Sequence, residues 1–178
     1  MNQTAFSPAQ RALHWLMAIM VLAMLFIGVV MVSTVRPAYL TLVAIHKPLG
    51  IAILVLALGR LALRVRRGAP PLPADLPAIQ VVGAKLSHVV LYALLVAMPL
   101  VGWGMLSAGG YPVVLAGVVH LPPILPHSDA LHAALLQAHI VLAYLFFATI
   151  LLHLGAALFH ALVRRDGVFQ AMTGAGAR

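Results

Sequence analysis

Four long apolar runs, separated by three connecting segments, divide this chain. The second connection, residues 68–77, carries four prolines and cannot be a helix interior. Each run has the roughly 20 residues that a helix needs to cross the ~30 Å hydrocarbon core of a bilayer. The pattern therefore predicts an all-α integral membrane protein, a four-helix bundle whose spans lie at about residues 9–32, 40–64, 83–106 and 131–163.

The pattern also indicates where the domain begins and ends. Ser7 followed by Pro8 favours a helix start, because serine caps a helix N-terminus and proline suits its first position. We expect residues 1–167 to be one four-span transmembrane domain and residues 168–178 to be a loose C-terminal tail. Residues 113–119 are apolar but too few to span, so we expect them in the membrane interface.

The amino-acid composition supports a membrane protein and excludes several kinds of binding site. The 178 residues are 63% hydrophobic and 8% charged, with a mean hydropathy of +1.08, whereas soluble domains carry about 25% charged residues. The chain has no cysteine, so covalent haem attachment and thiolate metal sites are excluded. The net charge of +8 comes from residues near the ends of the apolar runs, which argues for membrane topology and against nucleic-acid binding.

The basic residues predict which side of the membrane each connection faces. The two termini and the second connection, with the helix ends beside them, hold nine basic residues, and the other two connections hold two. Because cytoplasmic segments are rich in Lys and Arg, both termini should be cytoplasmic. The nine are Arg11, Arg60, Arg64, Arg66, Arg67, Lys85, Arg164, Arg165 and Arg178, and the two are Arg36 and Lys47.

Histidines are the main polar residues inside the runs. Those of the last run are His132, His139, His153 and His160. Their spacings are multiples of seven, and seven residues turn a helix to within about 20° of two full turns, so all four share one stripe. His139 and His153 are 14 residues apart, which is about 21 Å along a helix. In the earlier runs, His14 matches the depth of His153, and His46 matches that of His139.

Matching depths predict two histidine pairs, one near each membrane face. Two bis-histidine sites stacked across a bilayer are typical of two six-coordinate b-type haems, which carry electrons between the faces. A single histidine in a membrane is often only a buried side chain with a satisfied hydrogen bond. Four independent core histidines have no reason to pair by depth, so the pattern favours non-covalent haem ligation.

These residues resemble the bacterial cytochrome b561 family, which belongs with the di-haem b subunits of nickel–iron hydrogenases and formate dehydrogenases. The resemblance runs from about Gln10 to Arg165. The matching residues are Leu13-His14-Trp15-Leu16, His46 with Gly50-Ile51, Arg60 and Arg64, His88 with Tyr92, Pro99 and Gly102, and His139 with His153.

The resemblance implies two haem b groups in the bilayer, with four axial ligands: His14 and His153 for the inner haem, His46 and His139 for the outer. It also implies the bacterial inner (cytoplasmic) membrane as the location. Compact stand-alone members look like quinone-linked electron carriers. One member type oxidises superoxide at the periplasmic face and passes the electrons to ubiquinone, so the chain is expected to be an oxidoreductase of this kind or an electron-transfer protein.

Several other polar residues are secondary candidates. Arg60 and Arg64 lie four apart near the inner site, where they would pair with haem propionates, or would instead anchor the helix by snorkelling to the headgroups. Lys47 and Arg36 would form a positively charged surface near the outer haem, and its field would steer an anion such as superoxide. The alternative for Lys47 is an ordinary interfacial lysine.

The remaining histidines receive looser roles. His88 and His160 lie near the inner face, where either would contact a quinone or a propionate or relay a proton. His132 is the main rival of His139 for the outer haem, and we prefer His139 because its depth matches that of His46. His120 and His127 receive no role, since metal binding in an outer loop has no carboxylate or thiolate support here.

Three functions compete at this stage. The leading one is electron transfer between a periplasmic donor, small molecule or protein, and ubiquinone or another quinone in the lipid. The second is a cytochrome b anchor subunit that relays electrons between a separate periplasmic dehydrogenase or hydrogenase and quinone. The third is a histidine-lined metal or proton transporter, which is disfavoured because the spans hold almost no other polar residues.

Overall fold

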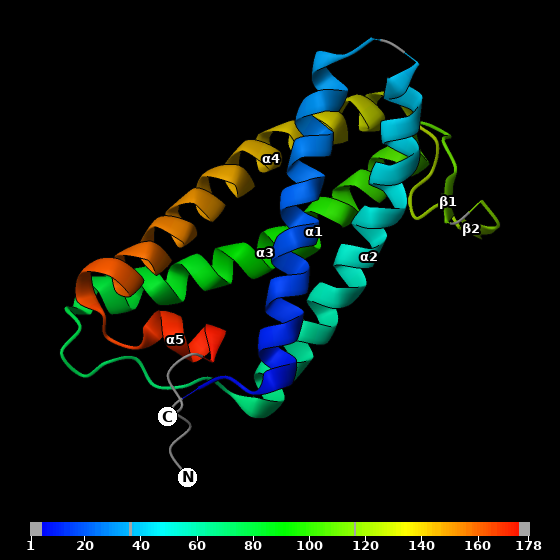
Figure 1. The fold of residues 1–178 in the computed structure, drawn as a ribbon. Coiled ribbons are helices and arrows are strands. Elements are labelled where there is room, and N and C mark those ends of the chain that lie inside the picture. Colours follow the sequence, from blue (N-terminus) through cyan, green and yellow to red (C-terminus); the bar gives the residue numbers. More distant parts are fainter. Residues whose placement is uncertain (1–4, 36, 116, 175–178) are drawn as a thin grey trace.

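Four long helices form the body of the computed structural model (Figure 1), which describes residues 5–35, 37–115 and 117–174. They are α1 (Pro8–Ser33), α2 (Ala38–Arg67), α3 (Ala78–Ala108) and α4 (Asp129–Leu158), and α4 continues into a π-helical turn, η1 (Phe159–Arg164). All four are long and apolar enough to cross a membrane. The predicted all-α, four-span fold is confirmed, and each helix extends a few residues beyond its apolar run.

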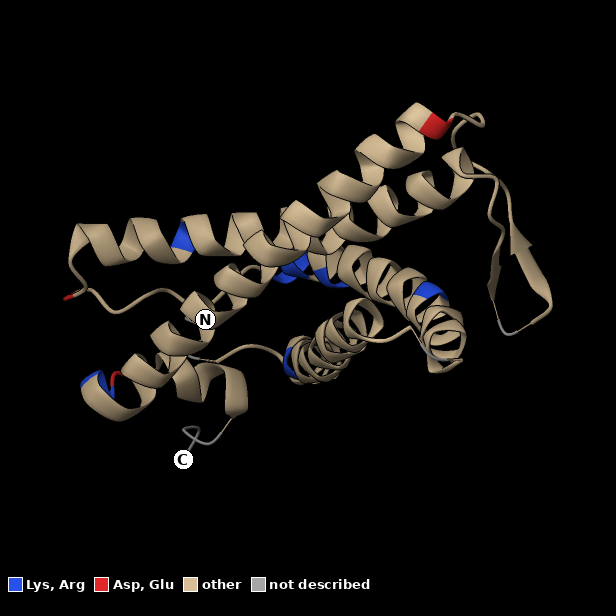
Figure 2. Ribbon diagram, turned by 90° about the horizontal axis from the view of Figure 1, so that it is seen from above, with Lys and Arg blue, Asp and Glu red and all other residues tan. Residues whose placement is uncertain are grey.

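The helices pack in two pairs. Helix α1 packs on α2, α3 packs on α4, and α2 joins the pairs through its contact with α3. The N-terminal segment and the C-terminal region lie at the same end of the bundle (Figure 1), where the Phe6 N–H donates to the Ala171 carbonyl at 3.1 Å. We call this the basic end, because it also holds Arg60, Arg64, Arg164 and their basic neighbours. Figure 2 shows acidic residues only at the extremities of the ribbon.

The start of α1 follows the predicted capping chemistry. The Ser7 hydroxyl accepts from the Gln10 N–H at 3.3 Å, and the Gln10 side-chain oxygen accepts from the Ser7 N–H at 3.0 Å. This reciprocal capping box satisfies two backbone donors that a bare helix end would leave unpaired. Ser128 caps α4 in a similar way, accepting from the Leu131 N–H at 3.3 Å.

The other end of the bundle carries a small antiparallel hairpin of β1 (Val113–Leu115) and β2 (Val119–Leu121), and we call it the hairpin end. The hairpin includes the residues expected in the membrane interface. Side chains of two spans hold this connection: the Lys47 ammonium donates to the Pro112 carbonyl and the Trp103 indole to the Pro122 carbonyl, both at 3.1 Å. The hairpin is therefore tied to both α2 and α3.

The described part of the segment that we expected to be a loose tail, which starts at residue 168, is ordered. It forms a short helix, α5 (Val168–Thr173), with glycines in left-handed conformations at both ends, Gly167 and Gly174. The Trp15 indole donates to the Met172 carbonyl at 3.3 Å. Hydrogen bonds to α1 and to the N-terminal segment thus order residues whose composition alone gave no sign of structure.

One buried apolar residue from each spanning helix contributes to a cluster that we call the central layer: Val21, Ile53, Leu94 and Phe146. Val21 and Ile53 each follow the histidine of their helix by seven residues, and Phe146 is seven residues from both His139 and His153. The central layer therefore lies between the two predicted histidine pairs. Elsewhere the packing is sparse, and no large side chain of the described residues is fully buried.

Candidate functional site

Histidines from different spans face one another at two depths. His14 of α1 faces His153 of α4 with ring centroids 6.3 Å apart and ring planes inclined by 71°. His46 of α2 faces His139 of α4, also at 6.3 Å, with planes inclined by 63°. These are the two pairs expected from depth alone, and helix α4 contributes one member to each.

The spacing within each pair fits two imidazoles on opposite sides of one metal ion. A metal–imidazole bond is about 2 Å long and the ring centre lies about 1 Å beyond the bonding nitrogen, so trans ligands have centroids about 6 Å apart. Two ring planes that share the ligand axis can also be rotated about it, as the inclinations of 63° and 71° require. The donor set, two neutral imidazoles and no thiolate, suits a six-coordinate b-type haem.

The hairpin-end pair shows a second sign of fit. The Nδ1 atoms of His46 and His139 are buried and have no hydrogen-bond partner among the described residues. Buried polar side-chain atoms nearly always have partners, so two such atoms in facing rings need an explanation. Neither Nδ1 atom has a hydrogen bond that fixes its ring, although the Met98 backbone lies near enough to His139 to act as an acceptor.

His132, the rival of His139, is occupied differently. Its Nδ1 lies 2.8 Å from the Met105 carbonyl of α3, and its ring packs against Tyr111 at 5.8 Å between centroids. His127 similarly lies 2.9 Å from the Ala108 carbonyl through its own Nδ1. Both histidines tie the start of α4 and the preceding connection to the end of α3, which is a structural role.

A third histidine joins the pair at the basic end. The His88 ring of α3 lies 5.5 Å from that of His153, with planes inclined by 70°. This separation is shorter than the roughly 6 Å that two trans imidazoles on one ion require. His88 thus lies beside the pair, as the sequence suggested from its depth, and the 6.3 Å spacing of His14 fits axial ligation better.

Two arginines of α2 line the basic end near this group. The Arg60 guanidinium donates to the Gln10 carbonyl at 3.3 Å and is close enough to His14 and His153 to interact with them electrostatically. The Arg64 guanidinium lies over the Phe6 ring, 5.4 Å from its centroid. Within the described chain neither arginine has a carboxylate partner, so both could pair with an added acidic group.

The proposed anion-steering residues lie at the hairpin end. Lys47 follows His46, and its ammonium is bonded to the Pro112 carbonyl, so it has an anchoring role that the sequence did not reveal. Arg36 lies outside the described residues. His120, in β2, pairs with Val114 across the hairpin.

Gly102 of α3 lies against the outer pair, a contact that sequence reasoning missed. A Cβ at this position would lie 3.3 Å from Cε1 and 3.5 Å from Nδ1 of His139. The first distance is tighter than ordinary van der Waals contact, so a larger residue here would displace the ring. Gly102 belongs to the family pattern, but nothing in the sequence says which side of α3 it occupies.

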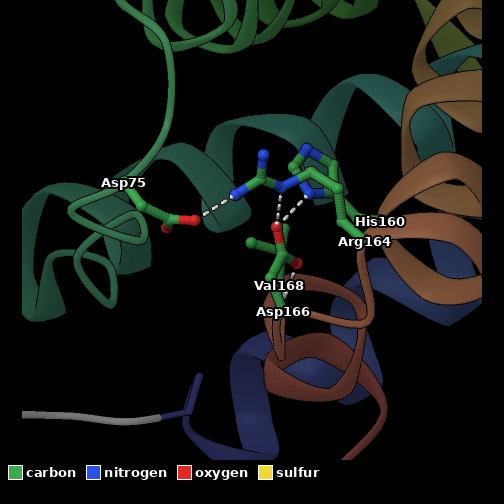
Figure 3. Close-up of polar contacts among 5 residues, drawn as sticks. All are labelled: Asp75, His160, Arg164, Asp166 and Val168. Atoms are coloured by element: carbon green, nitrogen blue, oxygen red, sulfur yellow. Dashed lines mark hydrogen bonds and ion pairs between the residues drawn. The ribbon is translucent and has the colours of Figure 1, made fainter.

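A polar network lies at the basic end (Figure 3), and it consists of His160, Asp166, Arg164 and Asp75. His160 Nδ1 lies 2.7 Å from one Asp166 oxygen, which also accepts from Arg164 Nε at 2.9 Å. Arg164 donates in turn from Nη2 to Asp75, in the connection between α2 and α3, at 2.7 Å. Burial alone would raise the pKa of the Asp166 carboxyl, but hydrogen bonds from His160, Arg164 and the Val168 N–H hold it below its usual range.

With this geometry in place, the comparisons with known proteins decide the family. A model described as prokaryotic cytochrome b561 matches residues 5–175. The chain belongs to the prokaryotic cytochrome b561 family. It is a membrane protein, and membership implies haem and electron transport.

Three members of the cytochrome b561 family illustrate the relationship. Cytochrome b561 homolog 1 of Escherichia coli (strain K12) is 30% identical over 175 residues, covering 94% of this chain and 96% of that protein. Cytochrome b561 homolog 2 of the same organism is 30% identical over 166 residues, covering 92% and 88%. A probable superoxide oxidase, CybB, of Yersinia pestis is 35% identical over 133 residues, covering 72% of each chain.

Proposed function

We propose that this protein carries electrons across the membrane through two bis-histidine b-type haems, from a donor at the hairpin end to a quinone at the basic end. His14 and His153 would hold the inner haem, and His46 and His139 the outer one. The observation that carries the proposal is the pair of facing imidazoles at each depth, both with the 6.3 Å spacing that trans ligation needs.

The orientation follows from charge. The basic end gathers the arginines of α2 and η1, so we place it and both termini on the cytoplasmic side. The hairpin end then faces the periplasm. Among the described residues, Lys47 is the only Lys or Arg at that end. With this orientation an electron that enters at the outer pair and leaves at the inner pair crosses most of the bilayer.

Two histidines at each site would hold the haem and leave its iron no open position for substrate, so the group would supply single-electron exchange. The chain supplies the rest. Helix α4 fixes one ligand of each site about 21 Å apart, and the central layer keeps water from the space between them. Arg60 and Arg64 offer guanidinium groups to haem propionates at the basic end.

Superoxide is the donor that we favour. One relative is named a probable superoxide oxidase, and Lys47 places a cation one residue from His46 at the end where an anion would arrive. Its bond to the Pro112 carbonyl leaves the positive charge in place, since a carbonyl does not neutralise an ammonium. Arg36, which lies between α1 and α2 in the sequence, would add to this field. Ubiquinone is the acceptor that we favour.

Optical spectroscopy of the purified protein tests the core of the proposal. We expect a reduced-minus-oxidised spectrum with b-type bands and two haems per chain, and a colourless protein would end the proposal. Rapid mixing with superoxide should then reduce the haems faster than mixing with buffer, and a ubiquinone analogue should reoxidise them. If superoxide reduces them no faster than buffer while a dehydrogenase does, the chain is an anchor subunit for a separate enzyme.

A further inference from the structure

His160 and Asp166 form a mostly buried pair at the basic end that the proposed haem ligation does not use. Their side chains are 14% and 10% exposed, and His160 Nδ1 lies 2.7 Å from the Asp166 carboxylate. His160 lies seven residues beyond His153 on α4 and η1, which is about 10 Å along the axis. The pair therefore lies between the inner histidines and the membrane surface.

The pair exists because the helix widens here. The Arg165 N–H bonds to the His160 carbonyl at 2.8 Å, a five-residue spacing that makes the turn π-helical. Such turns are rare and are frequently found at functional sites. Arg165 then takes a left-handed conformation, φ 54°, which is unusual for a non-glycine residue. The chain reverses at this point, and the Asp166 carboxylate comes back to the His160 ring.

The surroundings determine which ring nitrogen carries a proton. Arg164 donates to Asp166, and the Val168 N–H donates to its other oxygen at 3.3 Å, so the carboxylate is ionised and accepts only. His160 Nδ1 must then be the donor, which leaves Nε2 as the atom available for chemistry. Asp75 is bonded to Arg164 from outside, and α5, packed on η1, contains no charged residue.

We propose that His160 is the proton donor to quinone at the basic end and that Asp166 is its positioning residue. Asp166 fixes the Nδ1–H form of the ring and directs Nε2 away from the carboxylate. Arg164 donates to Asp166 and holds it in place. This inference rests on the proposed function, because it assumes that quinone is reduced at this end.

The electrons and the protons that reduce the quinone come from different groups. Reduction of one quinone to the quinol takes two electrons, supplied singly through the b-type centres of the proposed function, and two protons. In each half, the Nε2–H bond of the imidazolium breaks and an O–H bond forms on a quinone oxygen. His160 is left neutral, with its Nδ1–H still bonded to Asp166. Water from the cytoplasmic side restores the proton at Nε2 before the second half.

Asp166→Asn is the main test, with Asp75→Asn as its matched control, because Asp75 is 75% exposed and does not touch His160. In Asp166→Asn we expect two haems and unchanged haem reduction, but reoxidation by a ubiquinone analogue about 10- to 100-fold slower. This is less than the roughly 10²- to 10⁴-fold that a general acid contributes, because Asp166 acts only through His160. Asp75→Asn should change reoxidation less than about twofold, and Asp166→Glu should restore part of the rate.

A second readout does not depend on turnover. In protein labelled with ¹⁵N-histidine, the His160 resonances, assigned by their loss in His160→Gln, should show a fixed Nδ1–H form that Asp166→Asn abolishes. The double variant His160→Gln with Asp166→Asn should reoxidise no more slowly than His160→Gln alone. Unchanged reoxidation in Asp166→Asn, an unchanged ring form, or additive losses in the double variant would each overturn this inference. A protein without haem would instead overturn the proposed function and leave the ring-form measurement standing.

Discussion

The His88 ring lies closer to His153 than its expected partner His14 does, with centroids 5.5 Å apart against 6.3 Å. Proximity alone would favour His88 as the partner of His153. Trans ligation, however, requires about 6 Å, because an ion must fit between the rings. The longer separation therefore fits the proposed ligation by His14 and His153 better, and His88 lies beside that pair.

This distinction leads to a first prediction at the inner site. His14→Ala should lower the haem content from two per chain to one, because a single axial imidazole holds haem weakly. His88→Ala should retain two haems with unchanged low-spin bands. Haem quantification by pyridine haemochrome and the absorption spectrum together check both variants. Loss of a haem in His88→Ala with retention in His14→Ala would reverse the assignment.

The outer site allows the same comparison on a single helix. His139→Ala should remove one haem, whereas His132→Ala should keep both, since the His132 ring is bonded to the Met105 carbonyl instead of facing a histidine. Loss of that buried hydrogen bond should lower stability by about 1 kcal/mol. Haem content and thermal unfolding of the two purified variants measure these effects. Two haems in His139→Ala would show that the outer ligand is another residue.

Gly102 provides a test that leaves every histidine in place. Alanine in a helix is about 1 kcal/mol more favourable than glycine, but at Gly102 its Cβ would lie 3.3 Å from His139, and overpacking costs about 1–3 kcal/mol. Gly102→Ala should therefore shift the outer haem's absorption band and midpoint potential. Gly83→Ala, on the same helix with no atom within 4 Å of the new Cβ, is the matched control. Equal spectra in the two variants would contradict the contact.

The sequence predicted the spanning helices and the depths of their histidines, because helix length and the helical repeat determine both. Bilayer thickness determines the length of each span, and the helical repeat places His139 and His153 on one stripe at the depths of His46 and His14. What the sequence could not give was the rotation of α3 about its own axis, which decides that Gly102 meets His139 and that His88 lies beside His153. The short, glycine-containing sequence of residues 168–178 also does not distinguish a loose tail from α5.

The Asp166 network was missed for a related physical reason. In a regular α-helix, a residue six positions after His160 would lie about 120° around the axis from it, because each residue turns the helix by about 100°. Only the wider π-helical turn and the reversal at Arg165 bring Asp166 back to the ring. Sequence reasoning placed His160 at the correct depth, but a local break of the helical repeat determined its partner.

Lowering the pH should weaken the hydrogen bonds that the Asp166 carboxylate accepts. The folded-state pKa of Asp166 is lowered from its usual 3.8, so its stabilising contribution is fully present above that value and is lost as pH falls through the lower folded-state pKa. Hydrogen exchange of the Val168 amide, which donates to Asp166, should therefore accelerate below about pH 4 beyond the intrinsic pH effect. Asp75→Asn should keep this transition and Asp166→Asn should lack it. A transition that survives in Asp166→Asn would belong to another carboxyl.

Removal of haem should weaken the whole bundle, because the polypeptide alone buries little. No large side chain of the described residues is fully buried, and the central layer is a thin contact between the two helix pairs. A ligand that binds only the folded state stabilises it by about 2.7 kcal/mol at 100 times its Kd. Two haems should then raise the unfolding temperature by on the order of 10 °C, at roughly 2–4 °C per kcal/mol. Protein produced without haem and titrated with it should show this rise, complete at two equivalents. The double variant His14→Ala with His46→Ala should unfold at the same temperature with and without added haem, and an equal rise there would mean that the stabilisation does not come through these ligands.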